Sequence, residues 1–382
     1  MIRKYLLLGF LVSVFSCSSS ETKNENTEGL SNEWDLMILD SIQVDYLGDI
    51  NLLAVHPEGT HFLFGSSDDN KLILTDNKGE ITSIFDEPTD SPKSVGQFTS
   101  AATFFGDEIV AMGMNKLVVY DLDFQFIKSE KTPKIGRSMY YIGFDFLKPI
   151  SINGKEQLLS FNGGPKNEIP SNQPEYYQEY NTFELIDLDE NSFTPVVPFH
   201  PRSRFLSGEA FDFLRPNFQV DGSTVYFAYT NDSLLYSYDL ALGDESFEAI
   251  NIPFDKFLLN PGYQMKGQMD YETPQGQEGG IWGLFLSQEN VLITYNSGIE
   301  LENMPNLNQD RELVIKEMGR LNPMKWIVMD EKGNFSAPKL TDDKYSLSRT
   351  DSQGFLWAKQ NKYILESEPE FEVFYKLQLV QK

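Results

Sequence analysis

A short apolar run that closes on an acidic residue recurs along this chain. Its clearest copy is Lys116–Asp123, Lys-Leu-Val-Val-Tyr-Asp-Leu-Asp, in which branched and aromatic residues favour a β-strand and the aspartates favour a turn. Four further runs share the pattern: Lys71–Asp76, Thr182–Asp189, Ser233–Asp239 and Lys325–Asp330. A fifth, Glu372–Leu379, has the strand-like run without the closing acid. Six copies of one strand predict six copies of one structural unit.

A hairpin turn precedes each copy and joins two earlier strand-like runs. The turns are Pro57–Gly59, Gly106–Asp107, Asn153–Lys155, Asp221–Ser223, Gln288–Asn290 and Gln353–Gly354. A weaker fourth run follows the recurrent strand in five units: Ile81–Phe85, Phe126–Ser129, Phe193–Val197, Phe247–Ile252 and Phe335–Pro338. Each unit is therefore predicted to be a four-stranded antiparallel sheet, with strand A innermost and strand D outermost.

No fourth run follows Leu379 in the sixth unit. The segment Leu36–Asp45, which precedes the first unit, has strand character and can supply the missing strand. Such closure removes the open sheet edges that invite aggregation. The sequence thus predicts an all-β, six-bladed β-propeller closed by an N-terminal strand in the last blade. A seven-bladed propeller and a β-sandwich are the alternatives that the strand pattern leaves open.

The first 16 residues have the layout of a secretory signal, with Arg3 and Lys4 followed by the apolar run Tyr5–Phe15. That run is shorter than the ~20 residues that cross a bilayer. Cys17, the only cysteine, follows it where bacterial lipoproteins carry their acylated, palmitate-type anchor. We expect a signal peptide at 1–16, an acylated Cys17 with a disordered tether at 17–33, and a single propeller domain at 34–382. A plain cleaved signal is the alternative.

One blade carries a motif shared with known propellers. Asp351–Trp357, Asp-Ser-Gln-Gly-Phe-Leu-Trp, resembles the turn-and-strand unit of sensor-type and six-bladed TolB-like propellers. Together with the lipoprotein-like start, the whole pattern resembles an uncharacterised propeller lipoprotein family, a domain of unknown function, of Bacteroidota-type bacteria. The resemblance implies the propeller fold and brings no catalytic motif.

The net charge of the chain limits the kinds of partner that it can bind. The chain has a formal net charge of −26, which becomes −28 without Arg3 and Lys4 of the signal (−26 − 2). Nucleic acid is excluded, because its binding depends on lysine and arginine that neutralise phosphates. Anionic lipid is disfavoured for the same reason, so the lipid anchor alone is expected to hold a monomeric protein at the cell outer membrane. Whether it faces the periplasm or the exterior is open.

The long insertions all fall in B-to-C and D-to-A loops, which share one face of a propeller, here called the loop-rich face. They are Gly163–Asn181, Phe199–Phe211, Pro253–Gly279 and Gly298–Met324. Long loops in a compact fold are commonly functional, although drift on an unconstrained surface is the alternative. Asn308–Leu321 has near-helical apolar spacing and is predicted to be an amphipathic helix whose apolar side packs on the rim.

Arginines map to the same face or to inner strands. An acidic protein that gathers guanidinium groups there can bind carboxylate, sulfate or phosphate. The candidate ligand-binding residues are Arg137, Arg202, Arg204, Arg215, Arg349, Tyr263 and Tyr271. The alternative is that each arginine pairs with a nearby carboxylate and that the tyrosines are packing residues.

Motifs for chemistry are sparse. Three histidines and no metalloprotease, nucleophile-elbow or phosphate-loop motif disfavour a histidine-based metal site or triad, and no catalytic residue is identified. No cofactor is predicted, with Ca²⁺ left open because carboxylates are abundant. Two functional hypotheses remain. The first is a non-catalytic binding propeller for an anionic small molecule, a glycan or an envelope protein. The second is a carboxylate-based hydrolase or lyase acting on a saccharide or lactone in the central channel.

Overall fold

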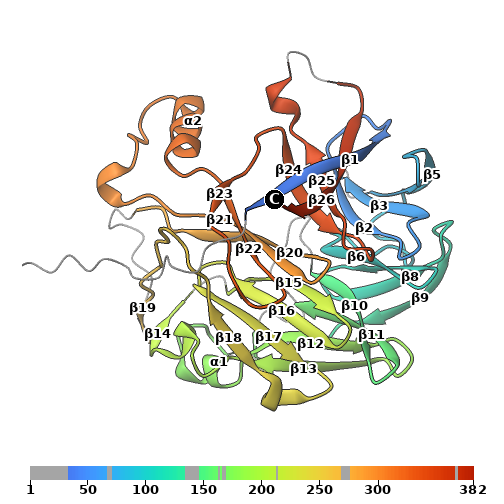
Figure 1. Ribbon diagram of the computed structural model, residues 1–382. Coiled ribbons are helices and arrows are strands. Elements are labelled where there is room, and N and C mark those ends of the chain that lie inside the picture. Colours follow the sequence, from blue (N-terminus) through green and yellow to red (C-terminus); the bar gives the residue numbers. More distant parts are fainter. Residues whose placement is uncertain are drawn as a thin grey trace, which may run out of the picture.

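Six four-stranded antiparallel sheets surround one axis, which confirms the six-bladed β-propeller (Figure 1). The computed structural model describes residues 33–66, 71–133, 146–161, 164–165, 169–211, 214–267, 276–365 and 369–382. The innermost strands contact one another in the ring order β2, β6, β10, β15, β20, β24 and back to β2. The ring is therefore closed, as the sequence predicted.

The strands of the first three blades follow chain order from the axis outwards. Blade one contains β2 (Ile50–Val55), β3 (His61–Ser66), β4 (Leu72–Asp76) and β5 (Ile81–Phe85). Blade two contains β6 (Ala101–Phe105), β7 (Glu108–Met112), β8 (Lys116–Tyr120) and β9 (Phe126–Lys131). Blade three contains β10 (Leu147–Ile152), β11 (Lys155–Phe161), β12 (Asn181–Asp187) and β13 (Ser192–Pro198).

The next two blades repeat this order, and the sixth borrows its outer strand from the other end of the chain. Blade four contains β15 (Pro216–Asp221), β16 (Thr224–Tyr229), β17 (Leu234–Asp239) and β18 (Glu248–Asn251). Blade five contains β20 (Gly280–Ser287), β21 (Asn290–Asn296), β22 (Lys325–Met329) and β23 (Lys339–Leu340). Blade six contains β24 (Tyr345–Thr350), β25 (Leu356–Gln360), β26 (Glu372–Gln381) and β1 (Trp34–Val44).

The recurrent acid at the end of the third strand builds the turn to the fourth. Asp121 Oδ1 accepts hydrogen bonds from the backbone N–H groups of Asp123 (3.0 Å) and Gln125 (2.7 Å). The equivalent carboxylates of the other four blades that have such a turn also accept backbone N–H bonds: Asp76, Asp187, Asp239 and Asp330. These acids are turn residues because a short side-chain acceptor stabilises a reversal of the backbone.

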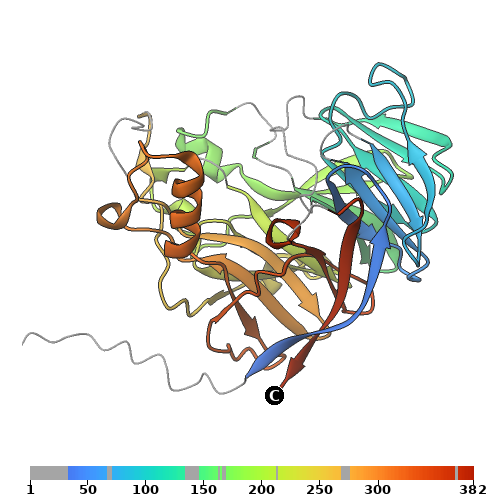
Figure 2. The same cartoon turned by 90° about the horizontal axis from the view of Figure 1, so that it is seen from above.

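The ring is closed by the N-terminal strand in the sixth blade, as the strand pattern predicted. β1 pairs antiparallel with β26 from Trp34 opposite Gln381 to Val44 opposite Glu372, and Figure 2 shows the two strands side by side. Buried Ile42 and Val44 pack in one apolar cluster with side chains of blade one. The closing strand therefore joins the last blade to the first.

The outer strand of blade five differs from the expected Phe335–Pro338. Phe335 makes only an isolated bridge to Met329, and Ser336 then bonds Val328 through both its N–H and its side-chain oxygen. Regular pairing resumes after Pro338, at Lys339–Leu340 opposite Lys325 and Trp326. The proline explains the correction, because it has no N–H to give to a strand ladder.

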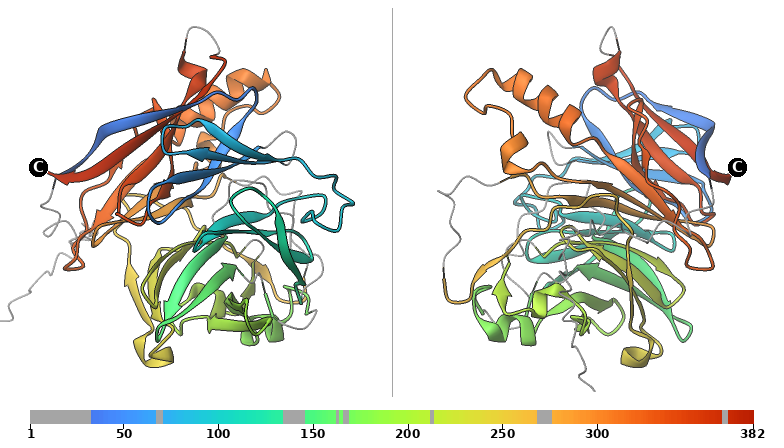
Figure 3. Two further views of the ribbon diagram at one scale, coloured as in Figure 1. Left: turned by 90° about the vertical axis from the view of Figure 1, so that its right-hand side faces the viewer. Right: turned by 60° about the vertical axis from the view of Figure 1, so that its left-hand side comes forward.

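The four insertions carry the irregular elements of the loop-rich face. The elements are α1 (Pro174–Gln178), the pair β14 (Glu209–Ala210) and β19 (Tyr263–Gln264), and α2 (Arg311–Leu321). The predicted helix is confirmed in α2, and Asp310 caps it by accepting from two backbone N–H groups. Its expected packing is wrong in part: no α2 side chain is buried, and Leu313 and Ile315 are 57% and 61% exposed. Figure 3 shows the reason, since α2 stands off the sheets at the end of a long excursion.

Candidate functional site

Two cavities lie between the inner strands, one towards each face of the ring. The upper cavity, of about 420 Å³, is lined by the starts of β2, β15, β20 and β24 and by residues 359–363. The lower cavity, of about 430 Å³, is lined by the opposite ends of most inner strands, by the start of β10 and by hairpin turns. Inner strands begin where D-to-A loops end, so the upper cavity opens towards the loop-rich face. Both volumes suit small-molecule sites.

Cations gather in the upper cavity. Its described lining residues include Arg215, Arg349, Lys359 and Lys362, with Asp49 as the one carboxylate among them. This contrasts with the whole chain, in which 57 acidic residues outnumber 31 lysines and arginines. A low-dielectric pocket lined by one sign of charge focuses the field and favours a ligand of the opposite sign.

The two lysines form one wall with carboxylates beside them. Lys359 Nζ lies 2.5 Å from Asp49 Oδ1 and donates to the carbonyl of Ile50 at 2.7 Å. The side chain of Glu372 is only 4% exposed and lies 3.6 Å from Lys359 Nζ and 3.3 Å from Lys362 Nζ. These ion pairs hold both ammonium groups at the cavity edge and partly balance their charge.

Arg349 is a buried cation that lies between the two cavities. It lines both of them, as does Gln219, and it is 7% exposed. Its Nε donates to the carbonyl of Leu53 at 2.7 Å and a terminal nitrogen donates to the carbonyl of Ser348 at 2.9 Å. Both carbonyls belong to the extra residues at register shifts, one in β2 and one in β24. A bulge takes a residue out of the ladder, which frees its carbonyl to hold the guanidinium.

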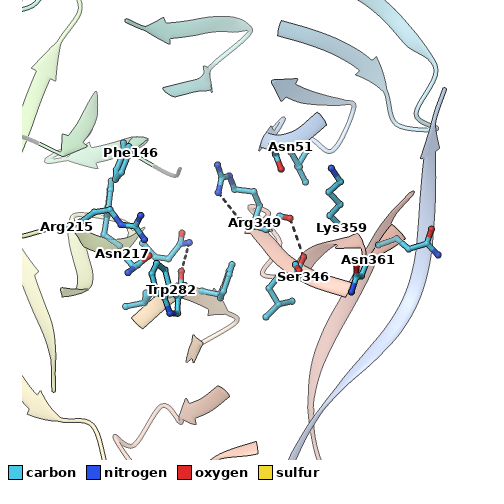
Figure 4. A pocket seen from close by; sticks show the side chains of 18 of the residues that line it. Asn51, Phe146, Arg215, Asn217, Trp282, Ser346, Arg349, Lys359 and Asn361 are labelled. Carbon is cyan, nitrogen blue, oxygen red and sulfur yellow. Dashed lines mark hydrogen bonds between the residues drawn. The ribbon is translucent and has the colours of Figure 1, made fainter. Parts of the chain in front are cut away.

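A third bulge presents an aromatic side chain. The register of β20 shifts between Ile281 and Gly283, so Trp282 is the extra residue, and it is 47% exposed. The guanidinium of Arg215 lies 5.7 Å from the centre of an indole ring of Trp282. Figure 4 shows Arg215 and Arg349 with their guanidinium groups directed into the same space, beside Trp282.

The predicted arginines thus divide into two groups. Arg215 and Arg349 share the upper cavity, but Arg202 donates to the carbonyl of Ala249 (2.5 Å) and to Asn251 Oδ1 (2.8 Å) on the outer part of blade four. Arg204 donates to the carbonyl and the side-chain oxygen of Asn231 and to a second loop carbonyl. The expected convergence of Arg202 and Arg204 with Arg215 is therefore not found, because an outer strand holds the guanidinium of Arg202 and loop carbonyls hold that of Arg204, both outside the upper cavity.

Burial has an electrostatic consequence at Arg204. Desolvation lowers the pKa of its guanidinium, against the opposing effect of nearby carboxylates, of which Asp232 is the strongest. The same guanidinium lies 4.9 Å from the ring centre of Phe211. Arg204 thus fastens the loops that carry it, and this role is structural.

The described tyrosines of the four insertions do not line the upper cavity. Tyr263 lies in the two-residue strand β19, paired with Ala210 and away from the residues that line the upper cavity. Of the other loop tyrosines, Tyr177 and Tyr180 are buried and bond the backbone of residues 211 and 214, so they are packing residues. Arg137, Tyr271 and Cys17 lie outside the described residues.

Sequence reasoning missed the lysines of the cavity wall and the role of Trp282. Lys359 lies one residue before the end of β25, the second strand of its blade. The available signal for Trp282 was its place between glycines at 280 and 283. Glycines beside an aromatic residue in an inner strand indicate irregular backbone.

One carboxylate that lines the lower cavity, Asp351, has structural partners. Asp351 Oδ1 accepts from the N–H groups of Gln353 (3.0 Å) and Phe355 (2.9 Å), and Oδ2 accepts from Trp357 Nε1 (3.0 Å). These bonds explain the conspicuous Asp351–Trp357 motif as a turn that fastens its own strand. Within the ranges described above, no group of three or more histidine, cysteine, aspartate or glutamate side chains is placed to hold a metal ion. No helix in those ranges is long and apolar enough to cross a membrane.

The fold and the site together define a six-bladed β-propeller with a cation-rich, tryptophan-bearing central cavity. No protein-family model matches the sequence, and no curated protein matches it. The structure is similar to a solved member of the duf4221 family from Bacteroides vulgatus, with a TM-score of 0.65 and 11% identity, covering 92% of this chain and 99% of that one. A second similar structure, from Bacteroides fragilis, has a TM-score of 0.51 and 12% identity, covering 93% and 98%. The expected likeness to uncharacterised propellers of Bacteroidota is thus confirmed at the level of the fold.

Proposed function

We propose that this protein is a non-catalytic binding propeller that takes a small anionic ligand into the upper cavity. The observation that carries the proposal is the placement of Arg215, Arg349, Lys359 and Lys362 around one space in a strongly acidic chain. Guanidinium groups offer paired donors that match carboxylate, sulfate and phosphate geometry. The cavity volume and its opening towards the loop-rich face are consistent with a small ligand.

The enzyme alternative has no comparable support. Among the described residues that line the two cavities, the carboxylates are Asp49, Asp221 and Asp351. Asp49 is ion-paired with Lys359, and Asp351 holds a turn. A two-carboxylate mechanism needs an acid and a base that face one substrate bond, so binding is the function that the geometry supports best.

The arginine contribution can be tested by substitution. A sulfate or D-glucuronate titration is expected to raise the melting temperature of the native protein, because a ligand that binds only the folded state stabilises it. Arg215→Gln is expected to weaken that binding about tenfold or more, since a hydrogen bond to a charged group contributes about 1.5–3 kcal/mol. Added NaCl is expected to reduce the effect through screening. Differential scanning fluorimetry measures each shift.

Arg202→Gln is the matched control, because it removes the same charge from a side chain bonded on the outside of blade four. It is expected to keep the anion-dependent shift. If neither anion raises the melting temperature, or if Arg215→Gln responds like the native protein, the upper cavity is not an anion site.

We further propose that acylated Cys17 anchors the propeller at the outer membrane through the polar segment 18–33. The support is the basic start, the short apolar run and the single cysteine behind it. Cys17→Ala is expected to move the protein from the membrane fraction to the soluble fraction, whereas Ser18→Ala is expected to leave it in the membrane fraction. Equal membrane association of both variants, measured by immunoblot of separated fractions, contradicts the anchor.

A further inference from the structure

We infer that the ligand of the upper cavity is an acidic sugar, whose ring stacks on Trp282 while its acid group faces Arg215 and Arg349. The inference rests on the proposed anion-binding function and specifies its ligand class. Three features of the cavity wall support it: an exposed indole, cations beside that indole, and side-chain amides whose orientation is already set. Each feature matches one part of a sugar acid.

Trp282 is the most exposed of the four tryptophans of the chain. Its exposed fraction is 47%, against 9%, 3% and 4% for Trp34, Trp326 and Trp357. The bulge in β20 directs it out of the sheet, and a Cβ at Gly280 would lie 2.9 Å from three of its indole atoms. The glycine therefore lets the indole lie close against the strand. An aromatic face beside water and polar groups suits a ligand ring that has one apolar face.

The amides beside Trp282 are oriented by the neighbouring blade. Asn217 Nδ2 donates to the carbonyl of Ile281 at 2.9 Å, and Gln219 Nε2 donates to the carbonyl of Leu284 at 2.8 Å. Each nitrogen donates one hydrogen bond to β20, and the amide oxygens can accept from a ligand. Both residues line the upper cavity. Acceptors on a pocket wall call for a ligand that donates, and hydroxyl groups are such donors.

These features exclude simpler ligands as the best match. An inorganic anion uses the guanidinium groups but neither the indole nor the amide oxygens. A neutral sugar uses the indole and the amides but leaves the cations without a counter-charge from the ligand. An aromatic acid uses the indole and the cations but has no hydroxyl donors for Asn217 and Gln219. A sugar that carries a carboxylate or sulfate engages all three.

Tryptophan fluorescence provides a direct test, because the other three indoles are buried. We titrate the full folded domain with D-glucuronate, D-glucose, benzoate and sulfate. D-glucuronate is expected to change the emission of Trp282 and to bind at least about tenfold more tightly than D-glucose or benzoate. Trp282→Phe is expected to abolish most of the emission change while retaining much of the affinity, which assigns the signal to this side chain.

Trp282→Ala distinguishes the contribution of the indole ring to binding from that of the cationic side chains. It is expected to weaken D-glucuronate binding about tenfold and to leave the sulfate-dependent rise in melting temperature intact, because sulfate does not need the indole. Circular dichroism confirms that the variant is folded. If Trp282→Ala binds D-glucuronate as the native protein does, or if benzoate matches D-glucuronate, the acidic-sugar class is wrong while anion binding stands. If D-glucose matches D-glucuronate, the acid group contributes nothing and the acidic-sugar class is also wrong; the sulfate-dependent rise in melting temperature then decides whether anion binding stands. If no anion binds at all, both proposals fail.

Discussion

A protein that begins at Asp45 is expected to lose most of its resistance to urea compared with one that begins at Glu33. The shorter protein lacks β1, so the edge of β26 and the apolar cluster around Phe62 and Phe64 are uncovered. Burial of Ile42 and Val44 contributes about 1.5–3 kcal/mol each. That sum, together with the lost strand ladder, is comparable with the roughly 5–15 kcal/mol that keeps a domain folded.

Urea unfolding followed by circular dichroism measures this effect as a fall in the midpoint, or as loss of the cooperative transition. Point variants of β1 serve as a graded control: Val44→Ala removes buried volume, whereas Leu39→Ala changes a residue that is 43% exposed at a register shift. Only Val44→Ala is expected to lower the midpoint. Equal midpoints for the proteins that begin at Glu33 and Asp45 would show that the ring does not depend on β1.

Phe227→Ala is expected to destabilise the folded protein by about 3–5 kcal/mol, as truncations of buried aromatic residues generally do. Phe227 is completely buried in the aromatic cluster between blades three and four. Its ring stacks on Tyr236 with centres 5.0 Å apart and meets Phe183 edge-on at 5.3 Å. The substitution therefore leaves a cavity that rigid neighbouring rings cannot fill.

The urea midpoint again provides the measurement, with an unchanged slope indicating that the unfolded state is the same. Phe126→Ala is the matched control, because Phe126 lies on the outer strand of blade two and is 38% exposed. It is expected to change stability by less than about 0.5 kcal/mol. A Phe227→Ala midpoint close to that of Phe126→Ala would mean that the cluster rearranges around the loss.

Neither the β1 side chains nor Phe227 itself lines the upper cavity. Phe218, which lies opposite Phe227 in the same blade, does line it. For the β1 variants, stability and ligand binding are therefore expected to separate, so that Val44→Ala, if folded, still binds D-glucuronate. Isothermal titration calorimetry at low temperature provides that comparison.

Interactions between residues close in the chain determined the strands and turns of the blades. The run Lys116–Asp123 predicted a strand and its turn correctly because both depend on residues close in the chain: branched side chains fit a sheet, and Asp121 bonds N–H groups two and four residues ahead. The closing strand could be predicted by counting strands, because the sixth blade lacked a fourth strand and the segment before the first blade belonged to no blade. The helix at Arg311–Leu321 could also be predicted from residues close in the chain, but its exposure to solvent could not.

Only the tertiary structure decided which residues share the cavity. Arg202, Arg204 and Arg215 lie close in sequence, yet an outer strand holds Arg202 and loop carbonyls hold Arg204, while Arg215 lines the central cavity. Trp282 and Arg349 owe their positions to bulges, and a bulge arises from pairing between strands rather than from either strand alone. Composition and spacing therefore determined the ring, whereas the register of its inner strands determined the site, because shifting one residue in a pleated strand turns its side chain to the other face.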